Sequence, residues 1–194
     1  MKLLHIDSSA LGGYSVSRQL TADIVAELKG ATPDLTHRYY DLAAEPLPHW
    51  SPVADAGDPA VAQSAEMLEE FLAADVIVIG APMYNFAISS SLKAWLDRIL
   101  VAGKTFRYTA NGPEGLAGGK RVIIASSRGG FYGKDTAAAA MDFQEPYLRH
   151  IFGFMGIDDV SFVRAEGLAV SPEQREASMR EALASIAAPL PLAA

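Results

Sequence analysis

Short continuous runs of apolar residues alternate along the chain with stretches in which apolar residues recur every three or four positions. The runs at 76–79 and 122–124 are apolar throughout, which is typical of strands buried on both faces. Leu20, Ile24 and Leu28 share one face of a helix. The pattern predicts strands at 3–6, 35–42, 76–79, 121–125 and 160–163, and helices at 15–29, 61–74, 88–101, 142–154 and 172–187.

Five strands that alternate with helices indicate an α/β fold with a parallel sheet and helices on both faces. The segment 103–119 is rich in glycine and polar residues and reads as an excursion from this pattern, such as a flap. We expect the tail at 189–192 to be loosely held. No internal repeat or linker divides the sequence, so we expect residues 1–194 to form a single domain.

Composition and charge narrow the possible functions. The net charge of −7 lacks the basic excess that is typical of nucleic-acid binders, so we expect no nucleic-acid partner. The sequence has no cysteine, which excludes disulfides and thiolate metal sites, and its four histidines lack ligand spacing, so no metal site is predicted. No apolar run approaches 18 residues and the N-terminus does not resemble a signal peptide; we expect a cytoplasmic protein without membrane spans.

Candidate chemistry lies in the loops that follow strands one, three and four. Parallel sheets bind ligands at the carboxyl ends of their strands, near the point where the strand order reverses. In the order 2-1-3-4-5 these three strands are neighbours, so their loops converge. Each loop alone is a weak signal, and the simpler interpretations are a capped helix, core aromatics and a plain turn. Their convergence favours one shared ligand site.

The first loop carries hydroxyl groups and leads into a helix whose free N–H groups suit a phosphate. Ser9 and the segment 15–17 offer these groups, and Arg18 is positioned in the first helical turn to add charge. The phosphate-binding pattern G-x-x-x-x-G-K-[ST] and the dinucleotide pattern G-x-G-x-x-G are both absent. The loop therefore predicts a phosphate site that uses hydroxyls and backbone rather than a lysine.

The second and third loops suit a planar ring. Tyr84 and Phe86 flank Asn85, which combines apolar walls with an amide that both donates and accepts hydrogen bonds. In the third loop, Gly129 and Gly130 permit close backbone approach and positive φ, and their N–H groups suit an anionic ring edge. The predicted ligand is a phosphate-bearing planar ring such as a flavin.

Together the three loops resemble those of FMN-dependent NADH-azoreductases, also called FMN-dependent NADH:quinone oxidoreductases. The resemblance covers nearly the whole chain and includes 103–108 and 111–116. The residues that carry it, and that it implies hold FMN, are Ser9, Ser15, Val16 and Ser17 for the phosphate, and Met83, Tyr84, Asn85, Phe86, Ser127, Arg128, Gly129 and Gly130 for the ring.

The resemblance also implies a flavodoxin-like fold and a homodimer in which both subunits shape each site. NADH or NADPH reduces the non-covalently bound FMN and leaves, and a quinone then takes hydride from N5; an azo bond needs two such cycles. Asn85, Tyr108 and Phe154 match the acceptor pocket of relatives, and Tyr132 stands where relatives often carry histidine. Because the chemistry takes place on the flavin, no catalytic side chain is predicted.

Two alternatives remain. A flavodoxin-type electron carrier would share the fold but would not oxidise NADH by itself, and the excursion at 103–119 argues against it. A serine hydrolase would use Ser127 and His150, but the first glycine of its G-x-S-x-G pattern is missing. Among other residues, we expect His5 and Trp95 to be core residues, and Trp50 to lie in a surface loop that is a candidate for reaching a partner subunit.

Overall fold

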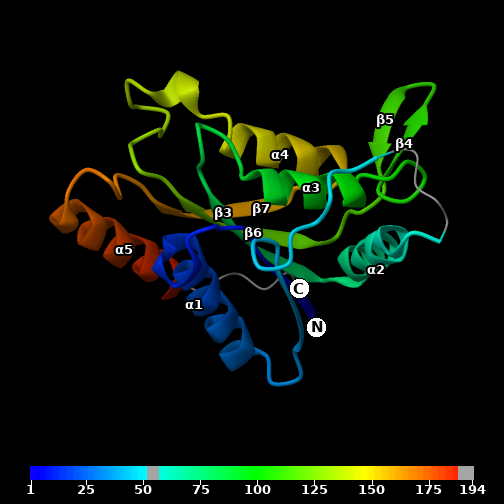
Figure 1. Ribbon diagram of the computed structural model, residues 1–194, viewed down its shortest axis with the longest axis horizontal. Helices are drawn as coiled ribbons and strands as arrows, with labels where there is room; N and C mark the ends of the chain where they lie inside the picture. Colours follow the sequence, from blue (N-terminus) through cyan, green and yellow to red (C-terminus); the bar gives the residue numbers. More distant parts are fainter. Residues whose placement is uncertain (52–56, 188–194) are drawn as a thin grey trace.

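The computed structural model, described here for residues 1–51 and 57–187, is built on a five-stranded parallel sheet (Figure 1). The strand order is β2-β1-β3-β6-β7, which is the predicted order 2-1-3-4-5. The strands are β1 (Lys2–Asp7), β2 (Thr36–Asp41), β3 (Val76–Pro82), β6 (Arg121–Ser127) and β7 (Asp159–Ala165). The predicted loose tail at 189–192 lies outside the described residues.

Two helix layers cover the sheet. The helices α1 (Val16–Ala31) and α5 (Pro172–Ala187) pack on one face, and α2 (Pro59–Ala73), α3 (Ser90–Ile99) and α4 (Glu145–Phe154) lie on the other (Figure 1). Every residue of β3 and β6 is buried, because both faces of these central strands contact helices. Trp95 and His5 are buried, as predicted, and Trp50 is exposed.

The helix ends follow local capping rather than the apolar pattern. Ser15 and Ser89 accept hydrogen bonds from backbone N–H groups in the first turns of α1 and α3. The predicted start of a helix at Asp142 is wrong, since α4 begins at Glu145. The carboxylate of Asp142 instead accepts the N–H groups of Gln144 and Glu145, at 2.9 and 3.1 Å. An acidic residue that caps in this way belongs to the turn before the helix.

The excursion at 103–119 contains an antiparallel hairpin of β4 (Phe106–Thr109) and β5 (Gly112–Gly115) beyond the end of the sheet (Figure 1). Gly115 lies so close to the end of α4 that a Cβ atom there would come within 2.1 Å of the backbone nitrogen of Gly156. The N–H of Ala117 also donates to the carbonyl of Met155, at 2.9 Å. The hairpin is therefore seated against α4 by a contact that needs glycine.

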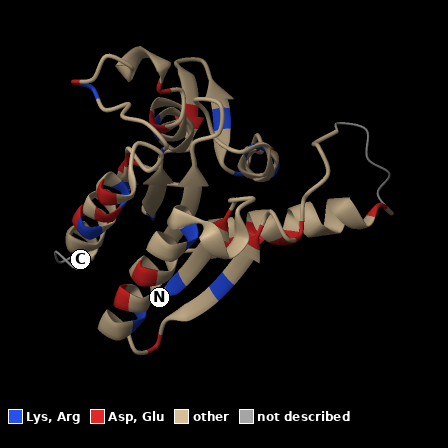
Figure 2. Cartoon of the chain, turned by 60° about the vertical axis from the view of Figure 1, so that its left-hand side comes forward, with Lys and Arg blue, Asp and Glu red and all other residues tan. Residues whose placement is uncertain are grey.

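The surface carries both signs of charge. Acidic and basic residues are interspersed along α1 and α5 (Figure 2). Among the described residues, no helix is both long enough and apolar enough to cross a membrane.

Candidate functional site

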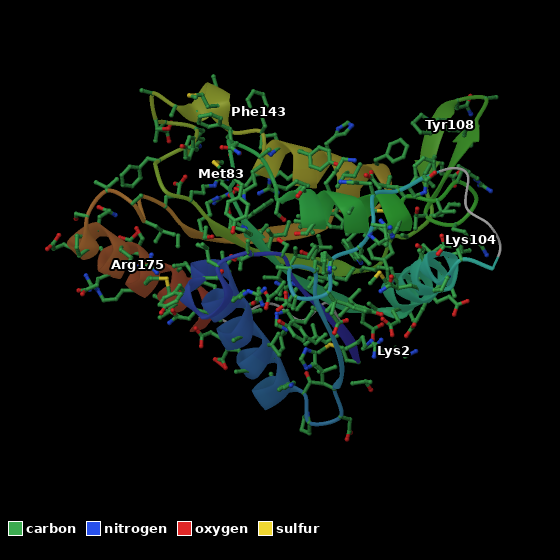
Figure 3. All side chains as sticks on the ribbon, viewed as in Figure 1. Lys2, Met83, Lys104, Tyr108, Phe143 and Arg175 are labelled. Atoms are coloured by element: carbon green, nitrogen blue, oxygen red, sulfur yellow. The ribbon has the colours of Figure 1, made fainter. Side chains whose placement is uncertain are left out.

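Three loops meet at the carboxyl ends of the neighbouring strands β1, β3 and β6, as the sequence predicts. The hydroxyl groups of Ser9 and Tyr84 are 3.2 Å apart, and the N–H of Ala10 donates to the same tyrosine oxygen at 3.1 Å. The N–H of Met83, which is labelled at this edge in Figure 3, donates to the carbonyl of Ser127 at 2.8 Å. These contacts join the first loop to the second and the second to the third.

The first loop and the start of α1 offer a set of polar hydrogen-bonding groups. Ser15 caps the helix, and its hydroxyl lies 3.1 Å from that of Ser17. The N–H groups of Val16 and Ser17 lie in the first turn, where no helical acceptor exists, and neither has another acceptor among the described residues. Two free N–H groups, nearby serine hydroxyls and the positive end of the helix dipole together suit a phosphate.

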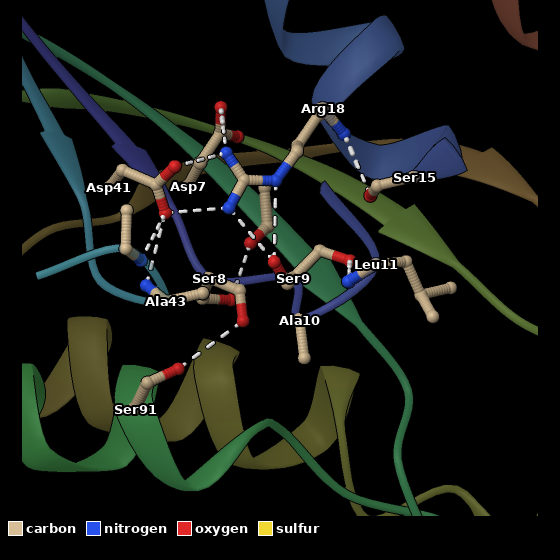
Figure 4. A network of polar contacts seen from close by, with 12 residues as sticks. Asp7, Ser8, Ser9, Ala10, Leu11, Ser15, Arg18, Asp41, Ala43 and Ser91 are labelled. Carbon is tan, nitrogen blue, oxygen red and sulfur yellow. Dashed lines mark hydrogen bonds and ion pairs between the residues drawn. The ribbon is translucent and has the colours of Figure 1, made fainter. Parts of the chain in front are cut away.

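Arg18 does not offer charge to a ligand at this point. Its guanidinium bonds to both oxygens of Asp41, each at 2.6 Å, and to the carbonyl of Ser9, at 2.8 and 3.3 Å (Figure 4). A further contact runs to the hydroxyl of Tyr39, at 3.3 Å. The side chain of Arg18 therefore braces the first loop from the side of β2.

The second loop is a tight turn at 84–87. The N–H and carbonyl groups of Tyr84 and Ala87 bond to each other, at 2.9 and 3.1 Å. Asn85 and Phe86 have φ angles of 48° and 72°, which correspond to a type I′ turn. Phe86 in this region is strained, because its Cβ crowds the backbone. The two Tyr84–Ala87 hydrogen bonds hold this turn, which places the exposed ring of Phe86 in contact with the ring of Tyr132, with centroids 6.1 Å apart.

The third loop presents backbone N–H groups. Those of Gly129 and Gly130 have no acceptor among the described residues. Neither glycine adopts the positive φ that the sequence analysis allowed for. A Cβ on Gly130 would lie 3.3 Å from the ring of Tyr132, so glycine here leaves room for that ring. The loop provides donors for an electron-rich ring edge without a left-handed backbone.

Arg128 lies beneath this loop with 1% of its surface exposed. Its guanidinium donates to Gln144 and to the hydroxyl of Ser126, at 3.0 and 3.1 Å. It also contacts three carboxylates, those of Asp142 at 2.9 Å, Glu145 at 2.8 Å and Glu166 at 3.0 Å. The side chain therefore ties together the third loop, the start of α4 and the end of β7.

A pocket of about 660 Å³ adjoins the second loop. Aromatic and aliphatic side chains form most of its wall, and burial raises the pKa of the Tyr147 hydroxyl. The lining residues are Tyr84, Asn85, Ala87, Ile88, Ser90, Lys93, Phe143 and Tyr147. Such a wall suits a flat apolar molecule with a few polar groups.

Comparison with known proteins decides the family. Residues 1–190 match a family model described as a flavodoxin-like fold. The chain is 60% identical over 188 residues to the FMN-dependent NADH:quinone oxidoreductase 1 of Xanthomonas axonopodis pv. citri, covering 96% of this chain and 95% of that protein. It is 59% identical over 194 residues to the protein of the same name from Methylocella silvestris, covering 94% and 95%. The chain belongs to the FMN-dependent NADH:quinone oxidoreductase family.

Solved structures agree with this family assignment. An FMN-dependent NADH-azoreductase from Bacillus anthracis, determined in complex with FMN, superposes with a TM-score of 0.85 at 26% identity, covering 96% of this chain and 98% of that one. A second azoreductase from Bacillus anthracis gives a TM-score of 0.87 at 29% identity, covering 96% of each chain. The predicted family and the flavodoxin-like fold are confirmed.

The structure brings together most of the residues that the sequence analysis assigned to FMN in this oxidoreductase family. Two residues that the sequence analysis assigned to the acceptor pocket, Tyr108 and Phe154, lie apart from this group. They lie with Phe106 in an aromatic cluster where the hairpin meets the end of α4, while Phe86 contacts the segment just before α4 begins. The helix has ten residues and is therefore about 15 Å long. Within one chain, these two residues lie far from Asn85.

Sequence reasoning missed the acidic partners of the site's arginines. Asp41 ends β2 and Glu166 follows β7, and neither lies in a loop that the sequence analysis singled out. A signal did exist for Asp41, since parallel pairing of β1 and β2 places it opposite Asp7, at the same edge of the sheet. Glu166 carried no comparable signal, because its contact with Arg128 depends on a loop conformation that the pattern does not fix.

Proposed function

We propose that this chain binds FMN non-covalently at the three loops and transfers hydride from NADH or NADPH to quinones, and to azo compounds in two cycles. The single observation that carries this proposal is the convergence of free N–H groups, serine hydroxyls and aromatic rings at one edge of the sheet. Ser9, Ser15, Val16 and Ser17 would hold the phosphate. Met83, Tyr84, Asn85, Phe86, Ser127, Gly129 and Gly130 would hold the ring, and the buried Arg128 would support the third loop from beneath.

The chain's own residues bind and orient, while bound FMN supplies the ability to accept hydride and pass it on. The N–H groups of Gly129 and Gly130, which have no acceptor among the described residues, would stabilise negative charge at the ring edge, and the aromatic pair of Phe86 and Tyr132 would border the ring. The pocket beside Asn85 is the place for nicotinamide and acceptor in turn. Correct placement of two rings is the protein's main contribution to such a reaction.

A steady-state assay tests this function. We expect the purified chain, loaded with FMN and kept free of oxygen, to turn over NADH repeatedly only when a quinone is added, and to do so without a second protein. NADH oxidation that requires a partner reductase would instead identify an electron carrier. The hydrolase alternative lacks support in the fold, because β6 ends at Ser127 and no helix follows directly, as a nucleophile elbow requires.

We further propose that the chain acts as a homodimer. The support is the separation of Asn85 from Tyr108, whose side chain is 76% exposed on the hairpin. A second copy that brings its own Tyr108 and Phe154 to this pocket would complete the acceptor site. Sedimentation velocity tests the dimer: a mass near twice 20.6 kDa is expected, and a monomer at working concentration would contradict it.

Two broader proposals accompany this function. Residues 1–194 would act as a single FMN-binding domain, and the protein would work in the cytoplasm, where NADH is available and a chain without cysteine needs no oxidising compartment. Cell fractionation with antibody detection tests the location, and recovery of the protein in a membrane or secreted fraction would contradict it.

A further inference from the structure

We propose that Arg18 and Asp41 form a clamp that positions Ser9 and thereby sets the affinity for the phosphate of FMN. In this inference Arg18 is a positioning residue and does not contact the phosphate. The inference rests on the proposed function, because it assumes that the first loop holds a flavin phosphate. It assigns a role to Arg18, in the first turn of α1, and to Asp41, at the end of β2, which the proposed function leaves without one.

The donors of Arg18 are all in use. A guanidinium has five N–H groups in a fixed plane. In Arg18 both terminal nitrogens donate to Asp41, at 2.6 Å each, and Nε and Nη2 donate to the carbonyl of Ser9 (Figure 4). Nη1 also contacts the hydroxyl of Tyr39, at 3.3 Å. These five contacts account for the five donors. No N–H of Arg18 remains for a ligand in this arrangement.

The clamp fixes the orientation of Ser9. Its carbonyl is held by the cation, while its hydroxyl bonds to Tyr84 and accepts the N–H of Leu11 at 3.3 Å. A carbonyl oxygen that faced an anion would repel it, so holding this carbonyl on Arg18 favours phosphate binding. The positive charge of Arg18 thus fixes the shape of the loop, and serine hydroxyls and backbone N–H groups would bind the phosphate.

Backbone groups that follow Asp41 in the sequence hold its side chain in place. Its carboxylate accepts the N–H groups of Ala43 and Ala44, at 3.0 and 3.1 Å. The hydrogen bond with Arg18 lowers the pKa of Asp41 to about 2, from an ordinary value of 3.8. Because this pKa is lowered in the folded chain, the contribution of the clamp to stability is complete above about pH 4 and is lost as the pH falls toward 2.

The second carboxylate near Arg18 belongs to Asp7, whose Oδ2 atom lies 3.8 Å from Nη1. Asp7 also accepts hydrogen bonds from Thr21 on α1 and Tyr39 on β2, at 2.9 and 3.1 Å. Burial and the neighbouring carboxylate of Asp7 raise the pKa of Tyr39 to about 12, so this hydroxyl stays neutral. The clamp therefore sits in a connected network across β1, β2 and α1.

The experiment compares two flavins that differ only by the phosphate. The full-length chain, freed of flavin, is titrated with FMN and with riboflavin by fluorescence, in the wild type and in the variants Asp41→Asn, Arg18→Met and Arg18→Lys. We expect all three variants to weaken FMN binding roughly tenfold or more while riboflavin binding changes by less than about threefold, since only the phosphate loop is affected. The double variant Arg18→Met with Asp41→Asn is expected to lose no more than either single variant, because the two side chains act as one unit.

The control is Arg38→Met. Arg38 lies on β2, like Asp41, but its side chain faces away from the first loop and forms an ion pair with Glu70 at 2.9 Å. This variant should leave both affinities unchanged. Full FMN affinity in Arg18→Lys would overturn the clamp, because lysine keeps the charge but lacks the fork. Equal loss of both flavins, or a loss in Arg18→Met that Asp41→Asn does not share, would also overturn it. A wild type that binds neither flavin would instead refute the proposed function, and Asp41→Asn carries the test if Arg18→Met does not fold.

Discussion

At the scale of single residues, two buried or half-buried arginines organise the site without facing the ligand. Arg18 shapes the first loop through Ser9, and Arg128 joins the third loop to α4 and β7. Both look like ligand-binding cations in the sequence, because each follows a strand in a polar loop. Their carboxylate partners are distant in the sequence, so only the structure distinguishes a structural cation from an available one.

Replacing Arg128 should reveal this structural role. Arg128→Met leaves Asp142 and Glu166 without their cation beside Glu145, which keeps only Arg164, and we expect this to lower the free energy of unfolding by about 3 kcal/mol or more. Urea denaturation at neutral pH measures the change. The exposed Arg180→Met is the control and should shift stability by no more than about 0.5 kcal/mol. A loss below about 1 kcal/mol in Arg128→Met would contradict the account.

At the scale of elements, the sequence predicts the framework well and the turns less well. Apolar runs identify β3 and β6 because burial on both faces leaves little choice of side chain. The start of α4 was misplaced because the capping role of Asp142 is not part of the apolar pattern. The type I′ turn at Asn85 and Phe86 carries no glycine, so the usual sequence signal for this turn is absent.

The sequence predicts the hydrogen-bond donors of the site but not the positions of its acceptor residues. Hydroxyls before a helix and glycines after a strand predict donors, and the N–H groups of Val16, Ser17, Gly129 and Gly130 have no acceptor in the part of the chain that the structure describes. The positions of Tyr108 and Phe154 could not be predicted, because they depend on how the hairpin packs on α4. That packing rests on the close approach of Gly115 to Gly156, two residues that are 41 positions apart in the sequence.

At the scale of the whole molecule, the strand order brings the three loops of the site together. Because β1, β3 and β6 are neighbours, three loops that are weak signals alone share one edge. The residues that the resemblance assigns to the acceptor are divided between the two ends of α4, which is the reason for proposing a dimer. The fold, the family and the loop geometry thus lead to one proposed flavin site, and the proposed second copy would complete its acceptor pocket.

The most direct test of the central claim is an anaerobic titration of the FMN-loaded chain, with no other protein present. We expect NADH to bleach the visible absorbance of the bound flavin, and a quinone added afterwards to restore it. A flavin absorbance that NADH leaves unchanged, or purified protein that takes up no FMN, would contradict the account.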